Sequence, residues 1–151
     1  MGPAILAGLE EAIKRGWLRG ISFNVQFHDT QCNAALATQA WEDLLVSGLP
    51  HVVFGPACDT ALLPVARQLH VRKVPLVTAG GMASAFSQAK TRPGDQFYML
   101  TRTGASYRDL ARTALRFMKE NGWGKFLLAY ASQDHSGWAG DYSCGFLKVT
   151  L

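Results

Sequence analysis

The sequence predicts an α/β fold, with a parallel β-sheet and helices on both of its faces. Two observations predict this class. Short apolar strands alternate with segments of 3.6-residue periodicity, and turns rich in glycine or proline follow several of the strands. The 151 residues are 48% hydrophobic and 17% charged, which is typical of one globular domain or of a piece of a larger one.

The first elements follow from local patterns in chain order. Pro3 suits the first turn of a helix, and apolar residues continue at helical spacing until Gly16. The segment ISFNVQF at 21–27 alternates apolar and polar side chains as a strand does. Residues 33–47 form a second predicted helix. The side chains that this helix should turn toward the core are Leu36, Trp41, Leu44 and Leu45.

The middle of the chain repeats the alternation of strand and helix. HVVFG at 51–55 predicts a short buried strand, and a third helix is expected over 60–70. Its Pro64 should lie near the first turn, where the missing N–H does no harm. VPLVTAGG at 74–81 predicts a strand that runs into a glycine turn.

The last part of the chain continues the pattern. Ser106, with Asp109 three residues later, opens a fourth predicted helix that ends at Asn121-Gly122. Its apolar face consists of Leu110, Ala111, Ala114, Leu115 and Met118. The other expected elements are a loop with a short helical piece at 83–96, strands at 97–102 and 125–131, and a polar loop at 132–143. Because a doubly wound fold normally opens with a strand, we expect this fold to be incomplete.

Charge and hydropathy disfavour two classes of protein. The net charge is +4, but the basic residues are scattered, with no run of five or more, so nucleic-acid binding is not expected. No stretch reaches the roughly 18 consecutive apolar residues of a membrane span. The first residues also lack the pattern of a secretory signal peptide.

The three cysteines allow more than one interpretation. Cys32 follows one predicted strand and Cys58 the next, so both should lie at the carboxyl edge of the sheet. Neighbouring strands are about 4.8 Å apart, which suits a disulfide. Cys58 at a helix N-terminus could also be a nucleophile, or both thiols could be inert and buried. Cys144 has no partner here if the first two pair. No zinc-type spacing links His28, His51, His70 and His135.

Six sequence blocks resemble one family, in matching order and with compatible spacing. They are GPAILAGLEEA, FNVQFHDTQC, VVFGPACDTALLPVAR, VPLVTAGGMASAF, LTRTGASYRDLARTALRFMKENGW and CGFLKV. Together they resemble the extracellular ligand-binding region of natriuretic peptide receptors and related receptor guanylate cyclases. That region belongs to the type I periplasmic-binding-protein class, a three-layer α/β fold. The resemblance implies that 1–102 form the membrane-distal lobe without its first strand, and that 103–151 begin a truncated second lobe.

The resemblance also implies roles for individual residues. Cys32 would pair with Cys58, and Cys144 with a cysteine beyond this sequence. The Thr30 hydroxyl and the N–H groups of Ala57 and Cys58 would hold a chloride ion. The candidates for hormone contact by position in the polar loop and after it are Ser132, Trp138, Tyr142 and Phe146.

The implied function is that of a cell-surface receptor whose extracellular part binds a peptide hormone as a homodimer. The signal would be cyclic GMP, made by a guanylate cyclase domain outside this segment, which itself would carry no catalytic residue, no metal and no cofactor besides chloride. Arg72 stands where the natriuretic members have a tryptophan in a region used for pairing. A contact with the membrane would be made only by segments not present in this sequence.

Two other functions fit the same residues. Whereas the lobes of the receptor would flank a hinge near Leu100–Thr103, a soluble carrier of the same fold would bind a small molecule of the amino-acid type between its lobes. The residues in contact would be Ala79, Gly80, Gly81 and either Ser106 or Tyr107. A cytosolic α/β enzyme would instead use Cys58 as its nucleophile.

Overall fold

The structure, a computed structural model, describes residues 2–87, 94–125 and 127. Its centre is a parallel three-stranded sheet in the order β1-β2-β3. The strands are β1 (Val53–Phe54), β2 (Leu76–Thr78) and β3 (Leu100–Arg102). In the register of this sheet, Leu76 lies opposite Val53 on one side and Leu100 on the other. The predicted α/β class and the parallel sheet are therefore confirmed.

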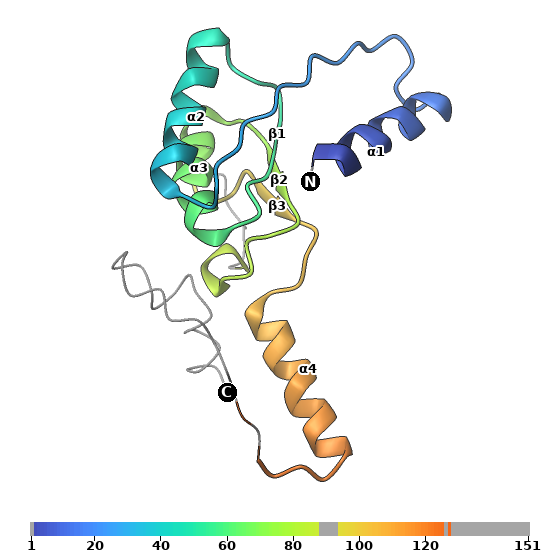
Figure 1. Ribbon diagram of the computed structural model, residues 1–151, viewed down its shortest axis with the longest axis vertical. Helices are drawn as coiled ribbons and strands as arrows, with labels where there is room; N and C mark the ends of the chain where they lie inside the picture. Colours follow the sequence, from blue (N-terminus) through green and yellow to red (C-terminus); the bar gives the residue numbers. More distant parts are fainter. Residues whose placement is uncertain (1, 88–93, 126, 128–151) are drawn as a thin grey trace.

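Two helices, α2 (Ala34–Ser47) and α3 (Asp59–Arg72), lie side by side next to the sheet (Figure 1). The helix α2 begins where Asn33 Oδ1 accepts hydrogen bonds from the N–H groups of Ala35 and Leu36, at 2.8 and 3.2 Å. The C-cap of α3 is Lys73, whose left-handed backbone (φ 59°) lets the following N–H, of Val74, donate to Leu69 O at 3.0 Å.

The core lies between this pair of helices and the sheet. Its largest fully buried apolar side chains come from α3, β2 and the short 3₁₀ helix η1 (Ser84–Ser87). They are Leu62, Leu69, Leu76 and Phe86. The ring of Phe86 meets that of Phe97 edge to face, with centroids 5.0 Å apart. Trp41 is buried as predicted, whereas Leu36, Leu44 and Leu45 are half-buried.

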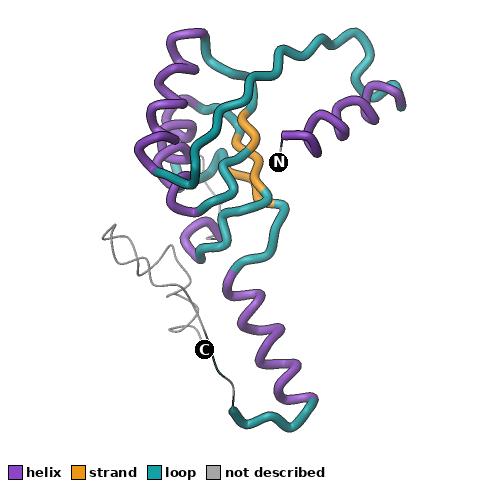
Figure 2. The backbone as a smooth tube through the Cα atoms, viewed as in Figure 1, coloured by secondary structure: helices purple, strands orange, loops and turns teal. Residues whose placement is uncertain are grey.

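One predicted strand does not form. Residues 21–27 are extended but belong to no strand, although their sequence alternates as a strand should. The apolar side chains Ile21, Phe23, Val25 and Phe27 are all exposed. Figure 2 shows this segment as a loop that runs from α1 (Gly2–Lys14) to α2. A strand needs a hydrogen-bonded neighbour, and none of the described residues provides one here.

The two outer helices have little packing in the described part of the chain. No residue of α1 is buried, and α4 (Tyr107–Glu120) buries Ala111 alone. Figure 1 shows α4 projecting away from the sheet. Leu110 and Leu115, predicted to face a core, are exposed. The polar loop at 132–143 and all but Lys125 and Leu127 of the predicted strand at 125–131 lie outside the described residues.

Candidate functional site

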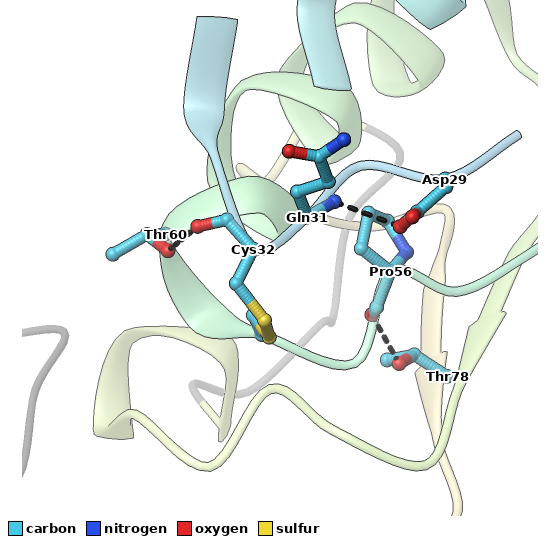
Figure 3. The surroundings of a disulfide bond; sticks show 7 residues. Asp29, Gln31, Cys32, Pro56, Thr60 and Thr78 are labelled. Atoms are coloured by element: carbon cyan, nitrogen blue, oxygen red, sulfur yellow. Dashed lines mark hydrogen bonds between the residues drawn. A yellow bond between two sulfur atoms is a disulfide. The ribbon is translucent and has the colours of Figure 1, made fainter. Parts of the chain in front are cut away.

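The candidate site is the carboxyl edge of the sheet, defined here as the turns that follow β1, β2 and β3. These turns are residues 55–58, 79–83 and 103–106. In open parallel sheets, ligands bind at this edge because the turns there place backbone groups and helix N-termini around one point. The segment 29–32 reaches the same edge through a disulfide (Figure 3).

The disulfide joins Cys32 to Cys58, with the two Cα atoms 5.4 Å apart. The hydroxyl of Thr60 reinforces this connection by donating a hydrogen bond of 3.0 Å to Cys32 O. Before the bridge, Asp29 Oδ1 accepts a bond of 2.9 Å from the N–H of Gln31 (Figure 3). The expectation that both cysteines follow strands of the sheet is wrong for Cys32. Cys32 follows an extended segment that is not part of the sheet, so the bridge joins a loop to the N-cap of α3.

Thr78, at the end of β2, ties the first turn to the second. Its side chain is 1% exposed, and its hydroxyl donates to Pro56 O at 2.6 Å while it accepts from Gly80 N at 3.0 Å. Gly80 lies so close to Ala57 that a Cβ atom added there would overlap the Ala57 carbonyl group. These two turns therefore pack backbone to backbone, with no room for a side chain between them.

Asp59, the first residue of α3, also binds the second turn, through its carboxylate. Its Oδ1 accepts from Met82 N at 2.9 Å and its Oδ2 from Ala83 N at 3.0 Å. Burial raises the pKa of this carboxyl above its ordinary value, because desolvation outweighs the hydrogen bonds and the attraction of Arg102. Arg102 itself donates from Nη1 to Gly81 O at 2.7 Å.

The third turn carries the chain from β3 into α4. Its start is fixed by Thr103 N, which donates to Thr78 O at 2.9 Å, and its end by Tyr107 N, which donates to Met82 O at 2.8 Å. Ser106 is the N-cap and forms a capping box with Asp109. The Ser106 hydroxyl donates to the Asp109 carboxylate at 2.6 Å, and this bond, with that of Ser106 N, lowers the pKa of Asp109.

The residues expected to hold chloride lie on two segments that the disulfide holds together. Thr30 and Cys58 are half-buried, and Ala57 is exposed. Among the described residues, no hydrogen bond uses the Thr30 hydroxyl or the N–H groups of Ala57 and Cys58 as donors. The N–H groups of Ala57 and Cys58 at the start of α3 are therefore unused, and so is the Thr30 hydroxyl on the 29–32 segment.

The residues of the small-molecule hypothesis are engaged in internal contacts, except for Ala79, which is exposed. Ser106 is 3% exposed with its hydroxyl in the capping box, and Tyr107 N is bonded to Met82 O. Gly80 faces the Ala57 carbonyl, and Gly81 is buried. The hormone-contact candidates Ser132, Trp138, Tyr142 and Phe146 lie outside the described residues, as does Cys144.

Sequence reasoning missed three residues that organise this edge, namely Asp59, Thr78 and Arg102. Each binds backbone groups at least 21 positions away. An acidic residue in the first turn of a helix is ordinarily explained by the helix dipole, so the sequence did not indicate that Asp59 binds a distant turn. A polar residue at the end of an otherwise apolar strand, as in LVT, is the one local signal for Thr78.

The described residues contain no cluster of three histidine, cysteine, aspartate or glutamate side chains that could hold a metal ion. Over the same ranges, no helix has both the length and the apolar character needed to cross a membrane.

Comparison with known proteins identifies the family. The family described as receptor family ligand binding region matches residues 1–139. Atrial natriuretic peptide receptor 3 of Bos taurus is 29% identical over 114 residues, which cover 74% of this chain and 20% of the receptor. Atrial natriuretic peptide receptor 2 of Homo sapiens is 34% identical over 106 residues, covering 70% and 10%.

A nematode relative extends the comparison. Receptor-type guanylate cyclase gcy-6 of Caenorhabditis elegans is 31% identical over 122 residues, covering 80% of this chain and 11% of that protein. The chain thus spans a fifth or less of the length of these relatives. Since the family match covers most of the sequence, and the structure has the parallel α/β sheet expected of it, the chain belongs to the receptor family of ligand-binding regions.

Proposed function

We propose that the chain is part of the ectodomain of a cell-surface receptor that binds a natriuretic-type peptide hormone and signals through cyclic GMP. The observation that carries the proposal is the family match, together with relatives named as natriuretic peptide receptors and as a guanylate cyclase. The Cys32–Cys58 disulfide supports the extracellular side of a membrane, because such bridges persist in oxidising compartments.

Residues 1–102 would form the membrane-distal lobe and 103–151 the beginning of the second. This boundary would coincide with the end of β3, which precedes α4. Hormone binding would shift the arrangement of the lobes or of a homodimer about this crossing. In such a dimer, Arg72 lies in the last turn of α3, exposed and available to a partner surface.

Chloride fits the free donors at the disulfide. The Thr30 hydroxyl and the N–H groups of Ala57 and Cys58 would hold the ion, and their positive partial charges at a helix N-terminus favour an anion. The Asp59 carboxylate accepts hydrogen bonds from the 79–83 turn, so its two oxygens are engaged there. A chloride ion would stabilise the bridge region without taking part in chemistry.

The direct test is hormone binding by the gene product in its natural length, displayed on cultured cells. We expect saturable binding of a natriuretic peptide and a rise in cyclic GMP, with a peptide of scrambled sequence as the control. Alanine substitution of Ser132, Trp138, Tyr142 or Phe146 should weaken binding if these residues contact the hormone. Binding of no natriuretic peptide at micromolar concentration, with the protein confirmed at the cell surface, would refute the proposal.

The small-molecule carrier has less support, because the groups it would use are occupied. The Ser106 hydroxyl caps α4, and Gly80 is closed off by the Ala57 carbonyl. A thermal-shift screen with the standard amino acids separates the two functions. The receptor predicts no shift with any of them.

A further inference from the structure

The turn at 79–83 is held from both sides by groups that are distant in the sequence. On one side, the Asp59 carboxylate accepts from Met82 N and Ala83 N, at 2.9 and 3.0 Å. On the other side, the carbonyl of the same Met82 accepts from Tyr107 N at 2.8 Å. One peptide segment therefore connects the first residue of α3 with the first residue of α4.

This segment has little freedom to relax in any other way. Ala83 is fully buried, and a Cβ atom on Gly81 would come within 2.8 Å of Leu62 Cδ2. A Cβ atom on Gly104 would likewise overlap Ala79 O, so the second and third turns touch through their backbones. A change at Asp59 should therefore be transmitted through the turn.

The position of α4 depends on these few contacts in the described part of the chain. Its one buried residue is Ala111, and its apolar side chains Leu110, Leu115 and Phe117 are exposed. Figure 1 shows the helix leaving the sheet at the third turn, without packing along its length against α2 or α3. What fixes the start of α4 is consequently the hydrogen bonding of 103–107 to β2 and to the second turn.

We propose that Asp59 is a positioning residue for the crossing between the lobes. Its two carboxylate oxygens hold the 79–83 turn against α3, and the turn, through Met82 O, fixes where α4 begins. The disulfide places Asp59 itself, because Cys58 is the N-cap of α3 and is bonded to Cys32. The consequence for hormone response rests on the proposed function, whereas the mechanical role of Asp59 does not.

The test compares Asp59→Asn and Asp59→Ala with wild type in the purified protein of natural length, without ligand. Asparagine keeps the volume and one acceptor oxygen but cannot accept from both N–H groups, whereas alanine accepts from neither. Asp43→Asn is the matched control, because Asp43 is an exposed carboxylate on α2. The measurement is hydrogen–deuterium exchange resolved to single amides by mass spectrometry.

The informative amide is that of Tyr107. The first N–H groups of an α-helix have no partner within the helix, so its protection reports the bond to Met82 O. We expect Asp59→Ala to speed exchange at Met82, Ala83 and Tyr107 at least tenfold, and Asp59→Asn to do so by a smaller factor. Amides inside α3, such as that of Leu69, and the Asp43→Asn control should stay within twofold of wild type.

Two results would overturn the proposal. Fast exchange at Met82 and Ala83 with unchanged Tyr107 would show that the turn does not govern α4. A uniform acceleration that includes Leu69 would show that Asp59 contributes to general stability alone. Should the alanine variant fail to fold, the asparagine variant gives the same comparison. The exchange experiment uses no hormone, so its result can be interpreted even if the proposed function is wrong. Cyclic GMP output of the same variants is a separate measurement that tests the consequence for hormone response.

Discussion

Removing the disulfide is the sharpest perturbation of this chain, and the double variant Cys32→Ala/Cys58→Ala isolates it. Alanine is the right replacement at both positions. Serine at position 58, the N-cap of α3, would gain a capping hydrogen bond that the bonded cysteine lacks. Glycine at position 32 would relieve a left-handed backbone (φ 53°), whereas alanine retains the Cβ atom and therefore the strain.

The expected loss follows from the loop that the bridge closes. The two cysteines are 26 positions apart, and the chain-entropy relation for a loop of that length gives about 3.5 kcal/mol at 25 °C. The bond from the Thr60 hydroxyl to Cys32 O persists in the variant, so part of the local structure should remain. For a unit of this size, the loss corresponds to a decrease of about 7–14 °C in Tm.

The assay is urea unfolding of the oxidised wild type and of the double variant, followed by circular dichroism, with the free energies extrapolated to water. Reduced wild type serves as a second reference, because it lacks the bridge but keeps both side chains. It should resemble the double variant within about 1 kcal/mol. A loss below about 1 kcal/mol in the double variant would refute the reasoning, since segment 29–32 would then be held at the carboxyl edge without the bridge.

Three further predictions concern the same edge and the core. Gly80→Ala should destabilise the fold by about 3 kcal/mol, since the new methyl group would overlap the Ala57 carbonyl. Urea unfolding measures this loss, with Gly94→Ala at an exposed glycine as the control. Phe86→Ala should cost about 3–5 kcal/mol by the same assay, and a loss under 1 kcal/mol would mean that its contact with Phe97 is absent. Because the pKa of Asp109 is lowered in the folded state, the ionised carboxylate stabilises the fold fully at pH values above its ordinary pKa. This stabilisation is lost as the pH falls through the lowered pKa, so Asp109→Asn should flatten the acid part of the curve of stability against pH.

Much of the sheet and of its helices could be predicted from periodicity and caps. Asn33, placed at the start of the predicted 33–47 helix, is the N-cap of α2, and the predicted capping pair Ser106 and Asp109 forms. The helix α3 begins at Asp59, so Pro64 lies in its second turn, later than expected. A proline there removes one backbone bond, and the burial of Leu62, Leu63 and Leu69 on the same helix offsets that loss.

The predicted strand at 21–27, which does not form, shows what a local sequence pattern cannot predict. Its alternation of Ile21, Phe23, Val25 and Phe27 is correct for a strand, but a strand also needs a neighbour, which the pattern cannot name. The outer edge of β1 is unpaired among the described residues as well, and Val52 and Phe54 beside it are exposed.

The last prediction concerns how the ionisation of Asp59 changes the stability of the fold with pH. Burial raises its folded-state pKa above that of the unfolded chain, so folding binds a proton more tightly. Its contribution therefore favours the folded state at acid pH and is lost as the pH rises through the raised pKa.

This slope is opposite to that of Asp109, and Asp59→Asn should remove it. The two acceptor oxygens of the carboxylate can do something that the single oxygen of an amide cannot, although ionisation of the carboxyl group opposes folding. Holding Met82 N and Ala83 N together is such a task. If stability measured from pH 3 to 7 has the same slope in Asp59→Asn and wild type, burial does not raise the pKa of Asp59 above that of the unfolded chain.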